Sequence, residues 1–232
     1  MQNQNLFEQI ITYFSTHTEA WGEAVAQHLL MCFAAVALAM LIGLPLGVFC
    51  SKNRIVKTFV TGIFSTLRII PSLAVLLLCL PVFGPGAVPA LIALSFLAIP
   101  PILINTTQAF AGVPAEVIET ATGLGMSPAR MFFRVKAPLA MPLVLAGIKT
   151  ATAEIIASAT LAAYIGAGGL GVMIFTGLGL QRADLLIVGG LSVAILSILA
   201  DTLLGLLEKR LVRYRNTDIK PMTARRLPHR AA

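Results

Sequence analysis

Long apolar stretches separated by short polar segments dominate this chain. A membrane-spanning helix needs about 20 mainly apolar residues in a row. Five stretches are long and apolar enough, and they cover residues 24–50, 56–82, 87–106, 139–164 and 183–207. The pattern therefore predicts an all-α integral membrane protein with about five transmembrane helices.

Composition agrees with this interpretation. The 232 residues are 57% hydrophobic and 12% charged, with a mean hydropathy of +0.89, whereas soluble domains carry about 25% charged residues. The three cysteines, Cys32, Cys50 and Cys79, lie in or at the ends of apolar runs. Their spacing suggests neither a disulfide nor a metal site.

The apolar stretches divide the chain into three parts. Residues 1–23 have no basic n-region and contain three glutamates, so we predict an extracytoplasmic lead-in and not a signal peptide. Residues 24–208 form the transmembrane domain, in which His28 is expected near the outer end of the first span, where hydration is easy. Residues 209–232 form a basic tail.

The longest interruption between two apolar stretches is residues 113–138, and its first half predicts a short helix. Pro114 suits the first helical turn, because proline lacks the N–H that would be unpaired there. Gly123 and Gly125 can end the helix in a left-handed conformation. Glu116 and Glu119 make this half acidic.

The second half of the same loop predicts another short helix. Ser127 is a favourable N-cap and Pro128 a favourable first residue. Pro138 is expected to close this helix and lead into the next apolar run. Two capped helices held between membrane spans are suited to docking a soluble partner.

Two ionisable residues inside predicted spans are candidates for a translocation path. Arg68 lies about 16 Å along a helix from Lys57. It should therefore face the bundle interior or water, or its segment should lie tilted in the interface, because a charge in lipid is costly. Glu154 stands near the middle of its span, and Lys149 projects roughly 140° away from it. The candidate partners of Glu154 are Arg68, Lys149 of a second copy, or water.

A glycine-rich segment, with Gly166, Gly168, Gly169 and Gly171, follows the fourth predicted span. Three of these glycines make a literal G-x-G-x-x-G. That fingerprint indicates dinucleotide binding only at a strand-to-helix turn of a β-α-β unit. Because the segment follows a membrane helix, we predict a re-entrant or loop segment at the outer face instead.

Basic residues are unevenly distributed between the two sides of the five predicted spans. One side receives 14 of the 17 basic residues. They are Lys52, Arg54, Lys57, Arg130, Arg134, Lys136, Lys209, Arg210, Arg213, Arg215, Lys220, Arg225, Arg226 and Arg230. The other side receives Arg182. The positive-inside rule therefore predicts an outside N-terminus, and a cytoplasmic 113–138 loop and C-terminus.

The 113–138 loop resembles the EAA loop of ABC-importer permeases. The family pattern is Glu-Ala-Ala, a glycine six residues after the glutamate, and a hydrophobic-x-Leu-Pro ending. The matching positions are Glu119-Thr120-Ala121, Gly125 and Val135-Lys136-Ala137-Pro138, with departures at Thr120, Val135 and Ala137. The resemblance implies that Glu119, Ala121, Gly125, Val135 and Pro138 belong to a coupling helix that enters a groove of an ATPase subunit.

A narrower resemblance covers roughly residues 30–212. The stretches IIPSLAVLLLCLPVFGPGAVPALIALSFLAIPPILINT and SATLAAYIGAGGLGVMIFTGLGLQRADLLIVGG resemble permeases for glycine betaine, carnitine and choline. Arg68 departs from that group, in which a glutamine is common. The resemblance implies the type I, MetI-like importer fold, a second permease copy or paralogue, a cytoplasmic ATPase that uses ATP and magnesium, and a periplasmic or extracytoplasmic substrate-binding protein. It also implies a multi-pass location in a bacterial cytoplasmic membrane.

No phosphate loop of the form G-x-x-x-x-G-K-[ST] and no acid–base or nucleophile constellation is visible in the sequence. We therefore expect no enzyme activity, cofactor or metal site in this chain, with lipid and a small solute as ligands and no nucleic acid. Two alternatives stay open. One is an ABC permease for another solute, such as an amino acid. The other is a self-sufficient secondary carrier or channel with Arg68 and Glu154 as its ion-coupling groups.

Overall fold

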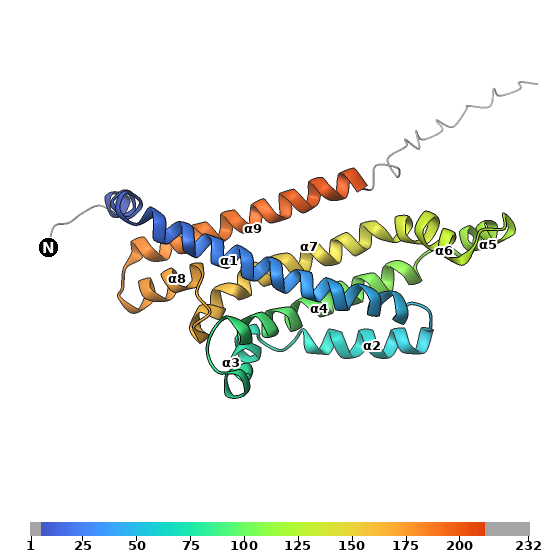
Figure 1. Ribbon diagram of the computed structural model, residues 1–232, viewed down its shortest axis with the longest axis horizontal. Helices are drawn as coiled ribbons and strands as arrows, with labels where there is room; N and C mark the ends of the chain where they lie inside the picture. The colour runs from blue at the N-terminus through green and yellow to red at the C-terminus, as the bar shows by residue number, and fades with distance from the viewer. Residues whose placement is uncertain (1–5, 212–232) are drawn as a thin grey trace, which may run out of the picture.

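The computed structural model describes residues 6–211, and all the regular structure in that part of the chain is helical (Figure 1). The α-helices are α1 Leu6–Cys50, α2 Arg54–Leu67, α3 Ser72–Phe83, α4 Ala87–Ala111, α5 Ala115–Gly123, α6 Pro128–Met131, α7 Ala137–Ala162, α8 Leu170–Gly179 and α9 Ala183–Leu211. A π-helical segment, Phe132–Lys136, joins α6 to α7, and a 3₁₀ turn, Ala163–Ile165, follows α7. The part of the tail beyond residue 211 lies outside the described residues.

Among the described residues, four helices are long and apolar enough to cross a membrane: α1, α4, the continuous segment Pro128–Ile165, and α9. The predicted span 56–82 is not a single straight helix. It consists of α2 and α3, which are bent by 88° at the break between them, and the pair counts as a fifth span if both halves cross together. Pro71 explains the break, because proline has no N–H to donate and disfavours helical geometry at the preceding residue.

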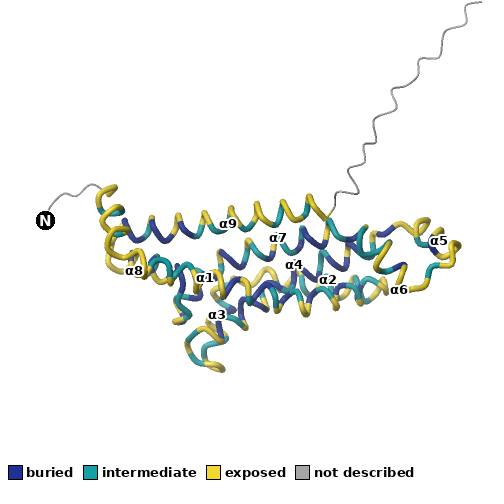
Figure 2. Tube along the Cα trace, turned by 45° about the horizontal axis from the view of Figure 1, so that its top comes forward, coloured by how far each residue is buried: buried dark blue, intermediate teal, exposed yellow. Residues whose placement is uncertain are grey.

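Helix α4 is the centre of the bundle and packs between α1 and α7. Small residues permit this close approach. A Cβ atom added to Gly47 of α1 would lie 2.6 Å from the Cβ of Thr106, and one added to Gly147 of α7 would lie 2.7 Å from the Cβ of Asn105. Figure 2 shows buried positions running along α4 and α7. Pro100 and Pro101 both lie inside α4, which continues through them as one helix.

The lead-in 1–23 is helical from Leu6 onward and belongs to the same helix as the first span. The helix is kinked at His17, where φ is −129° and ψ is 23°. Figure 1 shows the turns before the kink nearly end-on, so they point across the rest of α1.

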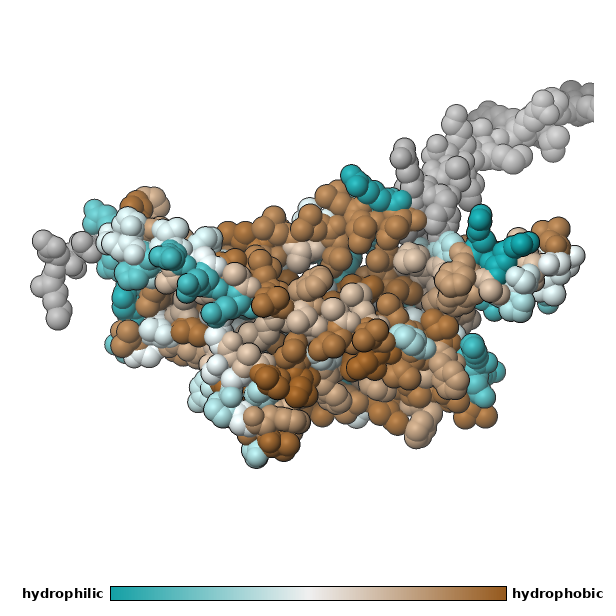
Figure 3. All heavy atoms as spheres, in the orientation of Figure 1, coloured by the Kyte–Doolittle hydropathy of each residue, from teal (hydrophilic) through white to brown (hydrophobic). Residues whose placement is uncertain are grey.

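The bundle has two polar ends and an apolar middle (Figure 3). The α1–α2 turn, α5, α6 and the last turns of α9 lie toward one end, and α8, the α8–α9 turn and the start of α1 lie at the other (Figure 1). Large apolar side chains are exposed between the ends, among them Leu30 and Phe33 of α1. Such a surface needs lipid or a partner chain to cover it.

Candidate functional site

The first half of the 113–138 loop is a helix closed by a left-handed glycine. Gly125 has a φ of +72°. Its N–H donates to the carbonyl of Thr122 at 2.9 Å, and the N–H of Met126 donates to the carbonyl of Ala121 at 3.2 Å. These two bonds form a Schellman motif, which satisfies carbonyls left free at the end of α5. Gly125 is therefore the left-handed cap, and Gly123 is the last helical residue.

The second half of the loop begins as the sequence predicts. The Ser127 hydroxyl accepts the N–H of Arg130 at 3.4 Å, and Pro128 is the first residue of α6. Pro138, however, does not close this helix. The chain stays helical from Pro128 to Ile165, and Pro138 is the second residue of α7. The π-helical segment Phe132–Lys136 explains this, because its extra residue per turn leaves room for a proline ring that would clash in a regular α-helix.

The five predicted coupling residues differ in exposure. Glu119 and Gly125 are exposed, Ala121 is buried, and Val135 and Pro138 are half-buried. Two large apolar side chains that sequence reasoning did not single out are exposed beside them, Leu124 at 74% and Phe133 at 71%. Phe132 stacks on Phe110 of α4 with ring centroids 5.5 Å apart, which ties the π-helical segment to the central helix.

Arg68 and Glu154 form an ion pair between the α2–α3 break and the middle of α7. They are 86 residues apart in the chain, so this pairing is a product of the tertiary fold. The pair lines a pocket of about 410 Å³. The pocket is lined by Leu67, Arg68, Ile69, Ile70, Pro71, Ser72, Phe96, Leu97, Pro100, Glu154, Ala157 and Ser158.

Lys149, the other basic residue inside a predicted span, does not pair with Glu154. Its Nζ lies 3.2 Å from Oδ1 of Asp201, so this ion pair joins α7 to α9. Lys149 and Glu154 therefore point in different directions from α7, as their spacing predicts. The two residues face different neighbours, Arg68 on one side and Asp201 on the other.

The glycine-rich segment is a turn followed by a short helix. Gly166, Gly168 and Gly169 have φ values of +81°, +82° and +76°, and Gly171 is the second residue of α8. A Cβ atom added to Gly171 would lie only 2.0 Å from the carbonyl oxygen of Thr160. The Gly169 N–H donates to Oε1 of Gln27 at 3.2 Å. These glycines therefore serve close packing of α8 against α7 and α1.

His28 is fully buried, contrary to the expected hydration. Its Nε2 lies 3.2 Å from the carbonyl oxygen of Ile156. Because a carbonyl only accepts, Nε2 carries the proton. A Cβ atom added to Gly169 would lie 3.3 Å from Nδ1 of His28, so the glycine-rich turn comes close to the ring.

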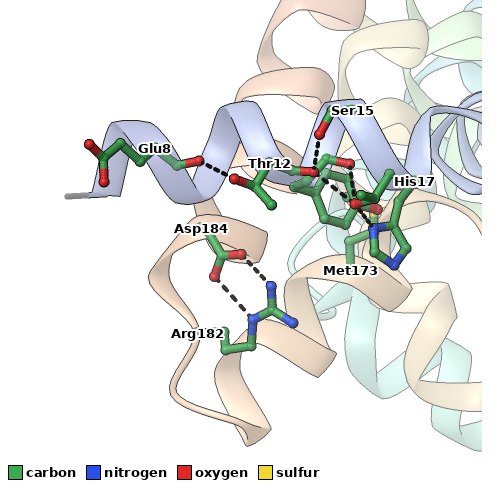
Figure 4. Close-up of polar contacts among 9 residues, drawn as sticks. Glu8, Thr12, Ser15, His17, Met173, Arg182 and Asp184 are labelled. Atoms are coloured by element: carbon green, nitrogen blue, oxygen red, sulfur yellow. Dashed lines mark hydrogen bonds and ion pairs between the residues drawn. The ribbon is translucent and has the colours of Figure 1, made fainter. Parts of the chain in front are cut away.

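A polar cluster that sequence reasoning missed lies at the end of the bundle that contains α8 (Figure 4). Arg182 donates to both carboxylate oxygens of Asp184, at 3.2 and 2.5 Å. That hydrogen bonding raises the pKa of the Arg182 guanidinium above its ordinary value. Tyr13 and His17 stack beside the pair, and the five polar residues Gln9, Thr12, Thr16, Arg182 and Asp184 join them around a pocket of about 340 Å³. The sequence did offer one signal for this cluster. Arg182, the only basic residue predicted on that side of the membrane, is followed two residues later by the acidic Asp184.

Within residues 6–211 no group of three or more histidine, cysteine or acidic side chains is placed to hold a metal ion.

Comparison with known proteins also identifies the chain as similar to permeases of transport systems. Residues 21–213 match the model of the family described as binding-protein-dependent transport system inner membrane component. The carnitine transport permease protein OpuCB of Listeria monocytogenes is 39% identical over 204 residues, which are 88% of this chain and 94% of that protein. The choline transport system permease protein OpuBB of Bacillus subtilis is 40% identical over 185 residues, which are 80% of this chain and 85% of that protein.

A solved structure shares the fold. A chain of the inward-facing MetNI methionine ABC transporter superposes with a TM-score of 0.69 at 23% identity, over 84% of this chain and 95% of that chain. The fold is therefore that of a MetI-like ABC importer permease. This chain belongs to the family of binding-protein-dependent transport system inner membrane components.

Proposed function

We propose that this chain is the permease subunit of an ATP-driven importer for quaternary ammonium solutes such as glycine betaine, carnitine or choline. It forms the translocation path and takes its energy from a separate ATPase subunit, having no ATPase site of its own. The substrate class rests on the similarity to OpuCB and OpuBB, which are named as carnitine and choline permeases.

The observation that carries the coupling role is the geometry of the 113–138 loop. Two short helices, α5 and α6, extend at one end of the bundle and are fixed relative to each other by the Schellman turn at Gly125. Leu124 and Phe133 are exposed in this loop, as are the basic residues Arg130 and Arg134. A mixed apolar and basic surface of this kind suits docking to a soluble protein.

The α6 end of the loop is rigidly joined to the transport domain. Because α6, the π-helical segment and α7 are continuous, a displacement of the docked loop is passed directly to α7. Helix α7 carries Glu154, which lines the pocket beside Arg68. The partner ATPase would thereby bias a two-state helix bundle from one end.

The orientation follows from charge. Six basic residues of the described part lie in the α1–α2 segment and the coupling loop, at one end of the bundle: Lys52, Arg54, Lys57, Arg130, Arg134 and Lys136. At the opposite end, Arg182 is neutralised by Asp184. We therefore place the coupling loop and the C-terminus in the cytoplasm, and the N-terminus outside a bacterial cytoplasmic membrane. A substrate-binding protein would dock at the outer end, and a second permease copy or paralogue would cover part of the apolar surface.

The docking role is tested by Glu119→Lys and Gly125→Asp. The first reverses an exposed charge, and the second puts a side chain on a left-handed residue. Each variant should insert into the membrane normally but lose ATPase subunit on co-purification and lose binding-protein-stimulated ATP hydrolysis. Glu19→Lys, an exposed charge reversal near the other end, is the matched control. Normal ATPase recovery and stimulation with both loop variants would refute the docking role.

A further inference from the structure

The pocket beside Arg68 lies where a predicted membrane span is interrupted. Helix α2 ends at Leu67 and α3 begins at Ser72, and residues from both ends line the pocket. A helix C-terminus presents unpaired carbonyls and attracts cations, while an N-terminus presents unpaired N–H groups and attracts anions. Pro71 makes no side-chain cap for α3. The carbonyls of Thr66 and Leu67 already accept the N–H groups of Ile69 and Ile70, at 3.0 and 3.2 Å. The dipoles of the two helix ends nevertheless give this small region partial charges of both signs.

Two side chains of opposite charge add to this arrangement. Arg68 comes from the break and Glu154 from α7, and their side chains remain 40% and 39% exposed. The rest of the lining supplies Phe96, Ser72 and Ser158 among apolar residues. An aromatic face attracts a quaternary ammonium group, as a carboxylate does. The volume of about 410 Å³ falls within the ordinary range of small-molecule sites.

We propose that this pocket is a transient binding site for a zwitterion that carries both a quaternary ammonium group and a carboxylate. The carboxylate of the zwitterion pairs with the Arg68 guanidinium. Its quaternary ammonium group binds to the Glu154 carboxylate and the face of Phe96. This inference deepens the proposed function and rests on it for the substrate class.

The ion pair gives the site a weak, exchangeable character. Without solute, Arg68 and Glu154 neutralise each other, which lowers the cost of holding two charges inside the membrane domain. A zwitterion replaces that one ion pair with two new ones, so both protein charges stay compensated. A transport site must bind well enough to admit the solute and weakly enough to release it.

The same exchange predicts selectivity. Choline carries the trimethylammonium group but has a hydroxyl where glycine betaine has a carboxylate. The trimethylammonium group of bound choline would pair with the Glu154 carboxylate and leave the Arg68 guanidinium without an anionic partner. A site built around a charged hydrogen-bonding group discriminates strongly against a ligand that lacks the complementary group.

The test is equilibrium binding of radiolabelled glycine betaine and choline to the permease–ATPase complex in lipid nanodiscs, without binding protein. The unaltered complex should bind glycine betaine about tenfold more tightly than choline, the effect expected for one charged hydrogen bond. Arg68→Gln should abolish this preference by weakening glycine betaine alone. Glu154→Gln should weaken both ligands to a similar degree.

Two further variants keep the result interpretable. Arg68→Lys preserves the charge but not the planar fork, so it should reduce the preference partly, and it carries the test if Arg68→Gln fails to assemble. Asp201→Asn breaks the other α7 ion pair, with Lys149, and should leave the preference unchanged. A complex that binds neither ligand saturably, or an Arg68 series that leaves the preference intact, would overturn the site.

Failure of the site and failure of the proposed function give different results. A complex that imports glycine betaine but shows no Arg68-dependent preference discards the site alone. A complex with the preference but no ATP-driven import keeps the site and discards the importer.

Discussion

The N–H of Met126 donates to the carbonyl of Ala121 across the left-handed Gly125, and this bond sets the direction in which α6 leaves α5. Gly125 and Ala121 are both positions of the EAA pattern. Their spacing is therefore the spacing of a Schellman cap, in which a glycine must follow the last helical residues at a fixed interval. In this chain, the Ala121–Gly125 part of the pattern is accounted for by the geometry of the turn, without reference to a partner protein.

Substitutions at Gly125 should follow left-handed propensity. No atom lies within 4 Å of an added Cβ there, so only the φ of +72° is unfavourable. Alanine costs about 1–2 kcal/mol in this conformation, and asparagine costs less. We expect Gly125→Ala to weaken ATPase association about tenfold and Gly125→Asn to weaken it less, measured by titration of the ATPase subunit onto the permease in nanodiscs.

Gly62 provides the control for that series. It also has open space around its Cβ position but lies in the regular helix α2, so Gly62→Ala should leave association unchanged. Equal effects of alanine and asparagine at position 125 would contradict the role of the left-handed turn.

Local signals in the sequence predicted the capping of the 113–138 loop well and the pocket beside Arg68 poorly. Ser127, Pro128 and Gly125 act through hydrogen bonds to residues only a few positions away, so their roles can be inferred from the adjacent sequence. The pairing of Arg68 with Glu154 depends on how α2, α3 and α7 pack, and it was one of three alternatives. Periodicity and apolar length could not separate these alternatives.

The incorrect predictions concern residues whose surroundings the adjacent sequence does not determine. Pro138 was expected to end a helix, but the π-helical segment before it accommodates the ring. His28 was expected to be partly hydrated, but it is buried, and its Nε2 lies 3.2 Å from the carbonyl oxygen of Ile156, 128 residues away in the chain.

Gly171→Ala should destabilise the whole permease. The added Cβ would lie 2.0 Å from a backbone carbonyl of α7, which cannot rotate away. Overpacking of this kind costs about 1–3 kcal/mol, so the thermal unfolding temperature in detergent should fall by several degrees. Gly179→Ala in the same helix meets nothing within 4 Å and should unfold like the unaltered protein. Similar unfolding temperatures for the two variants would contradict the tight α7–α8 contact.

The orientation predicts which loops a membrane-impermeant maleimide can reach. In a background in which Cys32, Cys50 and Cys79 are replaced, Leu180→Cys should react in intact cells. Ala129→Cys, in the coupling loop, should react only after the inner membrane is permeabilised. Both positions are exposed in the structure, so burial does not explain a difference, and the reverse labelling pattern would place the coupling loop outside.

The central claim, ATP-driven import of a quaternary ammonium solute, is tested most directly by uptake into proteoliposomes. The vesicles would contain this permease with its ATPase and binding protein, and uptake of radiolabelled glycine betaine and choline would be followed with and without ATP at the cytoplasmic face. We predict uptake of at least one of the two compounds that requires ATP, the ATPase and the binding protein together. ATP hydrolysis stimulated by the binding protein without uptake of either would contradict the substrate class. Uptake by the permease alone would contradict the importer itself.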